Sequence, residues 1–277
     1  MFESTRLSRR MILGGAATVL GAGLAGRAAL AQSVATIKSR GKVLIGIQGD
    51  NPPWGFVNTS GAADGFDAEI GKAFGAFLGV PAEFVPLAVV NRIPALTTGR
   101  VDILFATMAM LPERAKAVQF SVPYVANIIS LVAPKAANVK TNADMKKLVI
   151  GVPRASVQDT QITKNAPEGT TIRRFDDDAA TIQALLSGQV DAVGGNMFYM
   201  DRIEGAKPGM FENALEFTRL YNGACTRLGD KELNAAANTF LLQIRTNGVL
   251  EHAYKTWMKL TPPTFPESIP EIPFTVS

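Results

Sequence analysis

The sequence predicts an α/β protein of two lobes, each built on a parallel-rich sheet flanked by helices, with a hinge between the lobes. Three observations support this prediction. Strand and helix signals alternate along the chain, the alternation starts afresh in the second half, and a ten-residue unit occurs in both halves. Strands that alternate with helices form parallel sheets, because each helix returns the chain to the edge at which the next strand begins.

The first series of elements begins with the apolar run from Val43 to Ile47, which predicts a buried strand. From residue 66 to residue 78, apolar side chains recur at helical spacing behind a candidate N-cap at Asp67, and Gly79 is placed to end the helix. A strand at 83–87, a helix at 93–98 and a strand at 101–105 complete the series.

The second series repeats this order and predicts a second sheet. It begins with an apolar strand from Leu148 to Val152, followed by a helix that starts near Ser156. The remaining elements are a strand at 171–175, a helix at 179–187 and a strand at 190–194. Two sheets imply two lobes.

A short internal repeat links the two series. Residues 93–102 and 182–191 are identical at six of ten positions, including the glycine that ends the helix before each buried strand. The alternative is that any unit of helix, glycine and strand drifts toward such a pattern. Ligands of open parallel sheets bind beyond the carboxyl ends of the strands, so residues 106–109 and 195–197 are the expected walls of a cleft.

An export signal is predicted at the N-terminus, where Arg9 and Arg10 precede an apolar run at residues 11–25. This run of about 15 residues is too short for a membrane span of about 20. Ala29 and Ala31, which follow this run, are small residues at the two positions that a signal peptidase reads, and they predict cleavage after Ala31. Residues 1–31 therefore form the signal, and the product is expected in the periplasm. The arginine pair resembles a twin-arginine signal, although ordinary secretory signals also contain such pairs.

Removal of the signal lowers the formal net charge from +4 to about +1, because residues 1–31 hold four arginines and one glutamate. The basic character therefore belongs to the signal, which argues against a nucleic acid or an anionic membrane as partner. The single cysteine, Cys225, excludes an internal disulfide and a cysteine-rich metal site, and no cofactor is expected. The remaining 246 residues (277 minus 31) suffice for a large core.

A series of short motifs extends from about Lys42 to Leu260. They are Val43 to Gly46, Asp50 to Phe56, Gly65 to Asp67, Asn91 to Leu96, Gly99 to Asp102, Pro112 to Arg114, Phe120 to Tyr124 and Gly188 to Ala192. In order and spacing they resemble the bacterial extracellular solute-binding proteins of family 3, which serve polar amino-acid ABC transporters. Asn91 and Arg92, with the later Gly223 to Cys225, are most similar to members that take acidic amino acids.

The resemblance implies a two-lobe periplasmic-binding-protein fold of type II and no enzymatic activity. Lobe 1 would comprise residues 32–126 and 224–260, and lobe 2 residues 127–223, with crossings near 124–129 and 221–226. The proline-rich tail at 261–277 is expected to be extended and to act as a strap. The implied partners are a small carboxylate-bearing ligand and an ABC permease of the inner membrane, with the protein itself a monomer.

The resemblance also implies a ligand-binding site. Arg114 matches the family arginine that holds the ligand α-carboxylate, which a planar guanidinium binds with two parallel hydrogen bonds. The alternative for Arg114 is a surface ion pair with Glu113 or Asp102. The family positions whose backbone N–H groups assist correspond to Thr107, Ala109, Ser156 and Val157, the last two at an expected helix N-terminus.

Three further residues are candidates for the ligand side chain. Trp54 follows two prolines and is expected to form an apolar wall, or else to pack within its own loop. Gln48 matches a family position that faces the ligand, and Arg92 would add a cation there, unless it is a solvated helix residue. The acidic run at 176–178 precedes a helix, and capping is enough to explain it.

The sequence departs from the family at Asn196, where most members have an aspartate that neutralises the ligand α-ammonium. An amide supplies no countercharge, so this departure weakens the case for a standard α-amino acid. A dehydratase-like enzyme is the competing class, but the expected cleft is poor in titratable groups and the single histidine, His252, lies in a C-terminal helix. Asp67 and Glu69 are interpreted as capping residues of a helix.

Overall fold

The computed structural model describes residues 34–276. The predicted signal at 1–31 and its cleavage point at Ala31 lie outside the described residues. Within 34–276, no helix is long and apolar enough to cross a membrane.

Two groups of parallel strands form the ends of an eight-stranded sheet with the order β5-β1-β6-β11-β7-β10-β8-β9. The first half-sheet has β1 between β5 and β6, and the second has β8 between β9 and β10, all parallel. The strands are β1 (Val43–Ile47), β5 (Ala82–Pro86), β6 (Ile103–Leu104), β8 (Val149–Pro153), β9 (Thr171–Phe175) and β10 (Ala192–Asn196). The predicted pair of parallel strand series is therefore confirmed.

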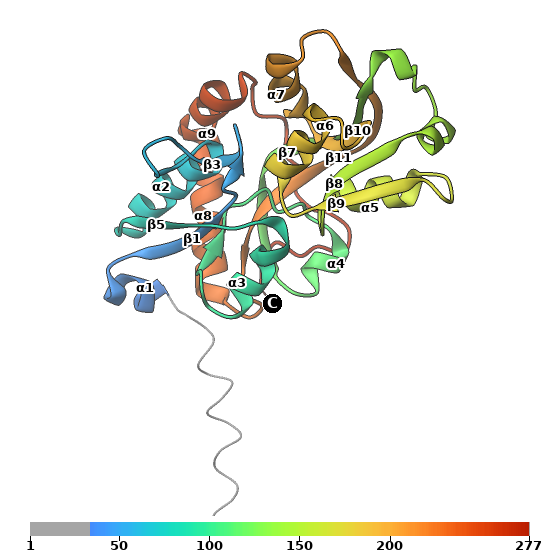
Figure 1. Cartoon of the computed structure of the whole chain (residues 1–277). Coiled ribbons are helices and arrows are strands. Elements are labelled where there is room, and N and C mark those ends of the chain that lie inside the picture. Colours follow the sequence, from blue (N-terminus) through green and yellow to red (C-terminus); the bar gives the residue numbers. More distant parts are fainter. Residues whose placement is uncertain (1–33, 277) are drawn as a thin grey trace, which may run out of the picture. The chain divides into compact units, whose positions relative to one another are not determined.

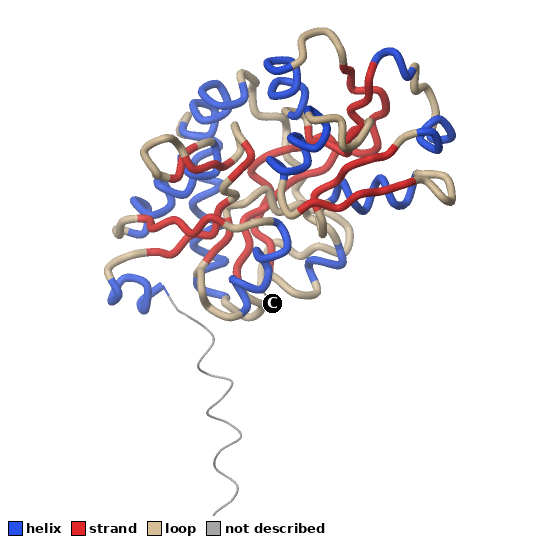
Figure 2. Tube along the Cα trace, viewed as in Figure 1, coloured by secondary structure: helices blue, strands red, loops and turns tan. Residues whose placement is uncertain are grey.

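The long antiparallel strands β7 (Gln119–Pro134) and β11 (Phe211–Thr226) connect the two half-sheets, as Figure 1 and Figure 2 show. Hydrogen bonding is therefore continuous across both halves, whereas the sequence predicted two separate sheets. The reason is length, since each strand has 16 residues and passes from one half to the other. The expected crossings at 124–129 and 221–226 lie inside these strands, near register shifts at Asn222 and Gly223. The lobe boundaries themselves stay a prediction.

Helices cover both half-sheets. They are α1 (Val34–Arg40), α2 (Phe66–Leu78), α3 (Arg92–Thr97), α4 (Pro112–Ala115), α5 (Val157–Asn165), α6 (Asp178–Leu186), α7 (Tyr199–Ala206), α8 (Lys231–Thr246) and α9 (Val249–Ala253). A small antiparallel sheet of β2 (Asp50–Asn51), β3 (Gly55–Val57) and β4 (Ala63–Asp64) follows β1. Gly79 ends α2 in the left-handed conformation, as predicted, but the N-cap of α2 is Gly65 and not Asp67.

The C-terminal part of the chain packs on the first half. Phe240 of α8 meets Phe74 of α2 with ring centroids 5.3 Å apart, and α9 joins the same core cluster through Leu250. The tail beyond residue 260 forms neither helix nor strand up to Val276, and the Asn238 side chain donates to the carbonyl of Phe274 at 2.7 Å. The side chain of Ile272 is buried in a core cluster that also contains Phe120 of the first half. The tail therefore packs on the first half, and its role as an extended strap stays a prediction.

Candidate ligand-binding pocket

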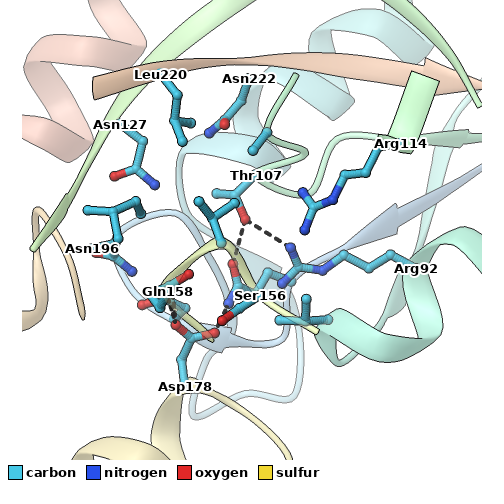
Figure 3. Close-up of a pocket in the computed structure, with 16 residues that line it drawn as sticks. Arg92, Thr107, Arg114, Asn127, Ser156, Gln158, Asp178, Asn196, Leu220 and Asn222 are labelled. Carbon is cyan, nitrogen blue, oxygen red and sulfur yellow. Dashed lines mark hydrogen bonds between the residues drawn. The ribbon is translucent and has the colours of Figure 1, made fainter. Parts of the chain in front are cut away.

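One pocket collects most of the residues proposed from the sequence, and it lies where the parallel strands end (Figure 3). Gln48, Arg92, Thr107, Ala109, Arg114, Ser156, Val157 and Asn196 line it. Asn196 is the last residue of β10 and Gln48 follows β1. Loops at the carboxyl ends of parallel strands meet at one edge of a sheet, which is why residues distant in sequence converge here.

Arg114 reaches the pocket from α4 and also contacts the second half, where its Nη2 donates to the carbonyl of Ala155 at 3.4 Å. It forms no ion pair with Glu113, and Asp102 pairs with Arg40 instead. Burial, and then the neighbouring charge of Arg92, lower the pKa of Arg114 to about 10, so the guanidinium stays charged at neutral pH. The structure therefore does not contain the surface ion pair considered as an alternative.

Arg92 is buried at the base of the pocket, so the solvated-helix alternative does not hold. Its Nη1 donates to the carbonyl of Ala106 at 2.6 Å and to Oγ1 of Thr107 at 3.1 Å. Nε and Nη2 have no hydrogen-bond partner within residues 34–276. Burial lowers the pKa of Arg92, and the carboxylates of Asp178 and Asp50 oppose that shift.

The four residues proposed as backbone donors differ in whether the protein itself already uses their N–H groups. The N–H of Thr107 donates to Asp67 at 3.1 Å, so it is not the open donor expected from the sequence. Ser156 caps α5 by accepting from the N–H of Asp159 at 3.0 Å. Among the hydrogen bonds of the described chain, none uses the N–H of Ala109 or Val157, and both residues line the pocket.

Asp67 was interpreted as a capping residue, and the structure corrects this. The side chain is fully buried and accepts from the hydroxyl of Tyr124 at 2.7 Å as well as from Thr107. Burial raises the pKa of Asp67 to about 6. Asp67 lies in the first turn of α2, and this position alone suggested capping. Its hydrogen bond to the Thr107 loop could not be inferred from the local sequence. Glu69 accepts from the indole of Trp257 at 2.6 Å.

Asp178 lines the pocket although the sequence interpretation gave the acidic run no role beyond capping. Asp177 is the cap of α6, accepting from the N–H of Ala180 at 2.7 Å. Asp178 is buried and accepts from the hydroxyl of Tyr199 at 2.6 Å and from Nε2 of Gln48 at 2.5 Å. Burial, and then the charge of Asp50, raise the pKa of Asp178 to about 6. The pocket lining thus includes one titratable carboxyl group, which the sequence interpretation did not place there.

Direct contacts join the two halves beside the pocket. The carboxylate of Asp50, from the first half, accepts from the N–H groups of Asp178 and Ala179 at 2.8 and 3.0 Å. Asn51 donates to Asp178 at 3.3 Å. The cavity between the lining side chains measures about 30 Å³, room for a water molecule or two. Only a small cavity therefore remains while these contacts between the halves are made.

Asn196 has its amide orientation fixed by two groups that can only donate. Its Oδ1 accepts from the N–H of Phe198 at 2.9 Å and from Nε1 of Trp54 at 3.4 Å. The amide nitrogen is therefore the group that remains for the pocket. Trp54 is fully buried behind it, edge-on to Phe66 and Phe198, and does not line the pocket as the expected apolar wall would.

Two further asparagines, on the strands that connect the halves, were missed by the sequence interpretation. Asn127 of β7 has its Oδ1 occupied by the N–H of Ile128 at 2.8 Å, which leaves its amide nitrogen toward the pocket (Figure 3). Asn222 of β11 is fully buried, and neither atom of its amide has a partner in residues 34–276. A polar residue within a strand gives no local signal that it faces a ligand.

No group of three or more histidine, cysteine, aspartate or glutamate side chains in the described part of the chain is arranged to hold a metal ion. Cys225 is free and buried. The chemistry available in the pocket is therefore that of two guanidiniums, one carboxyl group, amides and open backbone donors. This set suits the binding of a small anionic or zwitterionic molecule.

Several solute-binding proteins are similar to this chain over most of its length. The L-cystine-binding protein TcyJ of Escherichia coli (strain K12) is 26% identical over 91% of this chain and 96% of its own length. The ABC transporter glutamine-binding protein GlnH of Bacillus subtilis (strain 168) is 29% identical over 83% and 86%. The solved solute receptor for L-cysteine of Neisseria gonorrhoeae superposes with a TM-score of 0.76 at 30% identity, over 81% of this chain and 92% of that one.

The family model of the bacterial extracellular solute-binding proteins, family 3, matches residues 43–260. This range includes both half-sheets, the two long connecting strands and every residue that lines the pocket. The chain belongs to the bacterial extracellular solute-binding proteins of family 3.

Proposed function

We propose that this protein is the periplasmic substrate-binding component of an ABC importer, and that it binds a polar or acidic amino acid, or a close derivative, between its two halves. The observation that supports this most directly is the meeting of Arg114 with the open N–H of Val157 in one pocket. A guanidinium and a helix N-terminus from opposite halves can hold one carboxylate between them. The named relatives, which bind cystine and glutamine, support the amino-acid class.

The ligand would hold the two halves together through its carboxylate. Arg114 and Ala109 lie on the first half, whereas Ser156 and Val157 belong to the second. A ligand that contacts both sides stabilises the closed state relative to an open one, and the long strands β7 and β11 absorb the rotation. Gln48 and Arg92 would face the remainder of the ligand.

The proposal includes export and a membrane partner. Residues 1–31 would direct the chain across the inner membrane and be removed after Ala31. The free protein would act as a monomer and present its closed, loaded form to a permease of an ABC transporter. The near-neutral charge of the chain without its signal fits a partner other than nucleic acid.

Native mass spectrometry of gently purified protein, followed by calorimetry with the co-purified solute, tests the proposal. We expect one small carboxylate-bearing molecule per chain, bound without conversion. Repeating the titration with Arg100→Ala, which removes an exposed arginine outside the pocket, supplies a control that should bind normally. If no polar amino acid or related carboxylate binds, the proposed function is wrong.

A dehydratase-like enzyme is the second candidate, favoured by two observations. An ancestral amino-acid-binding protein described as a precursor of cyclohexadienyl dehydratase superposes with a TM-score of 0.74 at 29% identity, over 81% of this chain and 98% of that one. In addition, the pKa of Asp178 is raised to about 6 by burial, which suits a group that exchanges protons near neutral pH. Appearance of product from a bound carboxylate would favour this candidate over a transport role.

A further inference from the structure

We infer that the pocket selects a dicarboxylic solute, with one carboxylate at Arg114 and the second received by the amide nitrogens of Asn127 and Asn196. This inference rests on the proposed function and narrows its ligand class. The two asparagines lie across the pocket from the arginines in Figure 3. They come from β7 and from the end of β10, so the second site lies beside the strands that connect the halves.

The protein fixes which atoms these amides present. The backbone N–H of Phe198 and the indole of Trp54 can only donate, and both bind Oδ1 of Asn196. In the same way the N–H of Ile128 occupies Oδ1 of Asn127. Each side chain therefore offers an NH₂ group, which can donate to a ligand but cannot accept from it. A ligand ammonium or guanidinium finds no acceptor at these two residues.

Asn222 adds independent evidence that a polar ligand group completes this region. Its side chain is fully buried and lines the pocket, yet neither amide atom has a partner in residues 34–276. Buried polar groups in folded proteins are almost always hydrogen-bonded, so this amide is an expected ligand contact. Protein donors occupy Oδ1 of Asn127 and Asn196, whereas Oδ1 of Asn222 stays open. This single open amide oxygen can accept from at most one ligand amino group.

The charges in the pocket agree with an acidic ligand. Arg92 has Nε and Nη2 unpartnered within the described chain, beside the charged Arg114. The one carboxyl group in the lining, Asp178, already accepts from Gln48 and Tyr199 and is turned to the contact between the halves. The aliphatic side chains of Ile129 and Leu220 also line the pocket and would contact the hydrocarbon part of such a solute. Two guanidiniums thus face one carboxyl group in the lining, so positive charge exceeds negative charge there.

Isothermal calorimetry with four probes tests this inference on the unaltered protein, after bound solute is removed by unfolding and refolding. L-glutamate and glutarate contain two carboxylates, whereas L-glutamine has one and L-arginine carries an extra cation. We expect L-glutamate or glutarate to bind at least tenfold more tightly than L-glutamine, and L-arginine to bind most weakly. If L-glutamine or L-arginine binds as tightly as L-glutamate, the inference is overturned while the proposed function stands.

Two variants locate the second carboxylate. Asn127→Asp and Asn196→Asp each place a negative oxygen where an NH₂ group now lies, so each should weaken L-glutamate at least tenfold and L-glutamine much less. Asn142→Asp adds the same charge at an exposed position outside the pocket and should leave both affinities unchanged. Unchanged preference for L-glutamate in both pocket variants would contradict the assignment of these residues. If none of the four probes and no other amino acid binds, the proposed function itself fails.

Discussion

The N-termini of α5 and α6 lie at the same edge of the second half-sheet but are used differently. The first N–H groups of α6 are all occupied by protein carboxylates, those of Asp178 and Ala179 by Asp50 and that of Ala180 by Asp177. In α5, Ser156 caps the N–H of Asp159, and the N–H of Val157 stays open toward the pocket. One helix terminus is thus used to close the molecule, and the other is available to an anionic ligand.

This difference separates two contributions to the closed state. The contact of Asp50 with α6 needs no ligand, because both partners belong to the protein. The contact between Arg114 and α5 becomes strong only when a carboxylate lies between them. If the contact of Asp50 stabilises closure without ligand, it lowers the free energy that the ligand must supply.

The largest expected effect is a loss of ligand affinity when Arg114 is replaced. Arg114→Ala should nearly abolish binding while the fold remains, because it leaves a desolvated carboxylate without its partner. Truncation of one member of such a buried pair costs about 2 to 5 kcal/mol, or roughly thirtyfold to several thousandfold in affinity. Calorimetry measures this loss, and a loss smaller than threefold would mean that the carboxylate is bound elsewhere.

The next effect is the pH dependence of stability that arises from Asp178, at the N-terminus of α6. The pKa of Asp178 is raised from 3.8 to about 6, so the folded protein binds this proton more readily than the unfolded chain does. Protonation of Asp178 therefore increases the free energy of unfolding as pH falls through 6. This added stability is lost again as pH rises above 6. Between pH 7 and pH 4.5 the gain is about 2 kcal/mol, at about 1.4 kcal/mol for each unit of pKa shift.

Denaturant unfolding of the parent and of Asp178→Asn at these two pH values isolates the contribution of Asp178. Other carboxyl groups, including Asp67, titrate in both proteins and cancel in the comparison. The parent should gain stability on acidification relative to the variant. An identical pH dependence in the two proteins would show that Asp178 is not held in a buried, proton-binding environment.

A smaller effect is expected from Asp50→Ala, which removes the carboxylate that reaches α6 from the other half. An anion at a helix N-terminus contributes about 0.3 to 1 kcal/mol. Ligand-free protein should therefore show a larger radius of gyration in small-angle scattering, and ligand affinity should fall a few-fold because the closed state is less populated. Asp201→Ala removes an exposed carboxylate from α7 and serves as the control. Scattering that matches the parent would exclude Asp50 as a closing contact.

The two parallel strand series were predictable because hydrophobic periodicity is a local property of the sequence. The continuity of the sheet was not, since the passage of β7 and β11 between halves depends on pairing between distant segments. The same limit applies at the site. Positions after strand ends led to Asn196 and Thr107, whereas the capping explanation that holds for Asp177 concealed Asp178 beside it.

The last prediction compares the caps of the two helices directly. Ser156→Ala and Asp177→Ala each remove one N-cap hydrogen bond, so each should cost about 1 kcal/mol of stability. Only the first variant disturbs the helix terminus that faces the ligand, because Ser156 lines the pocket and Asp177 does not. Affinity should consequently fall a few-fold in Ser156→Ala and stay near the parent value in Asp177→Ala. Paired thermal melts and titrations measure both quantities, and equal losses of affinity in the two variants would remove the distinction between a ligand terminus and a closing terminus.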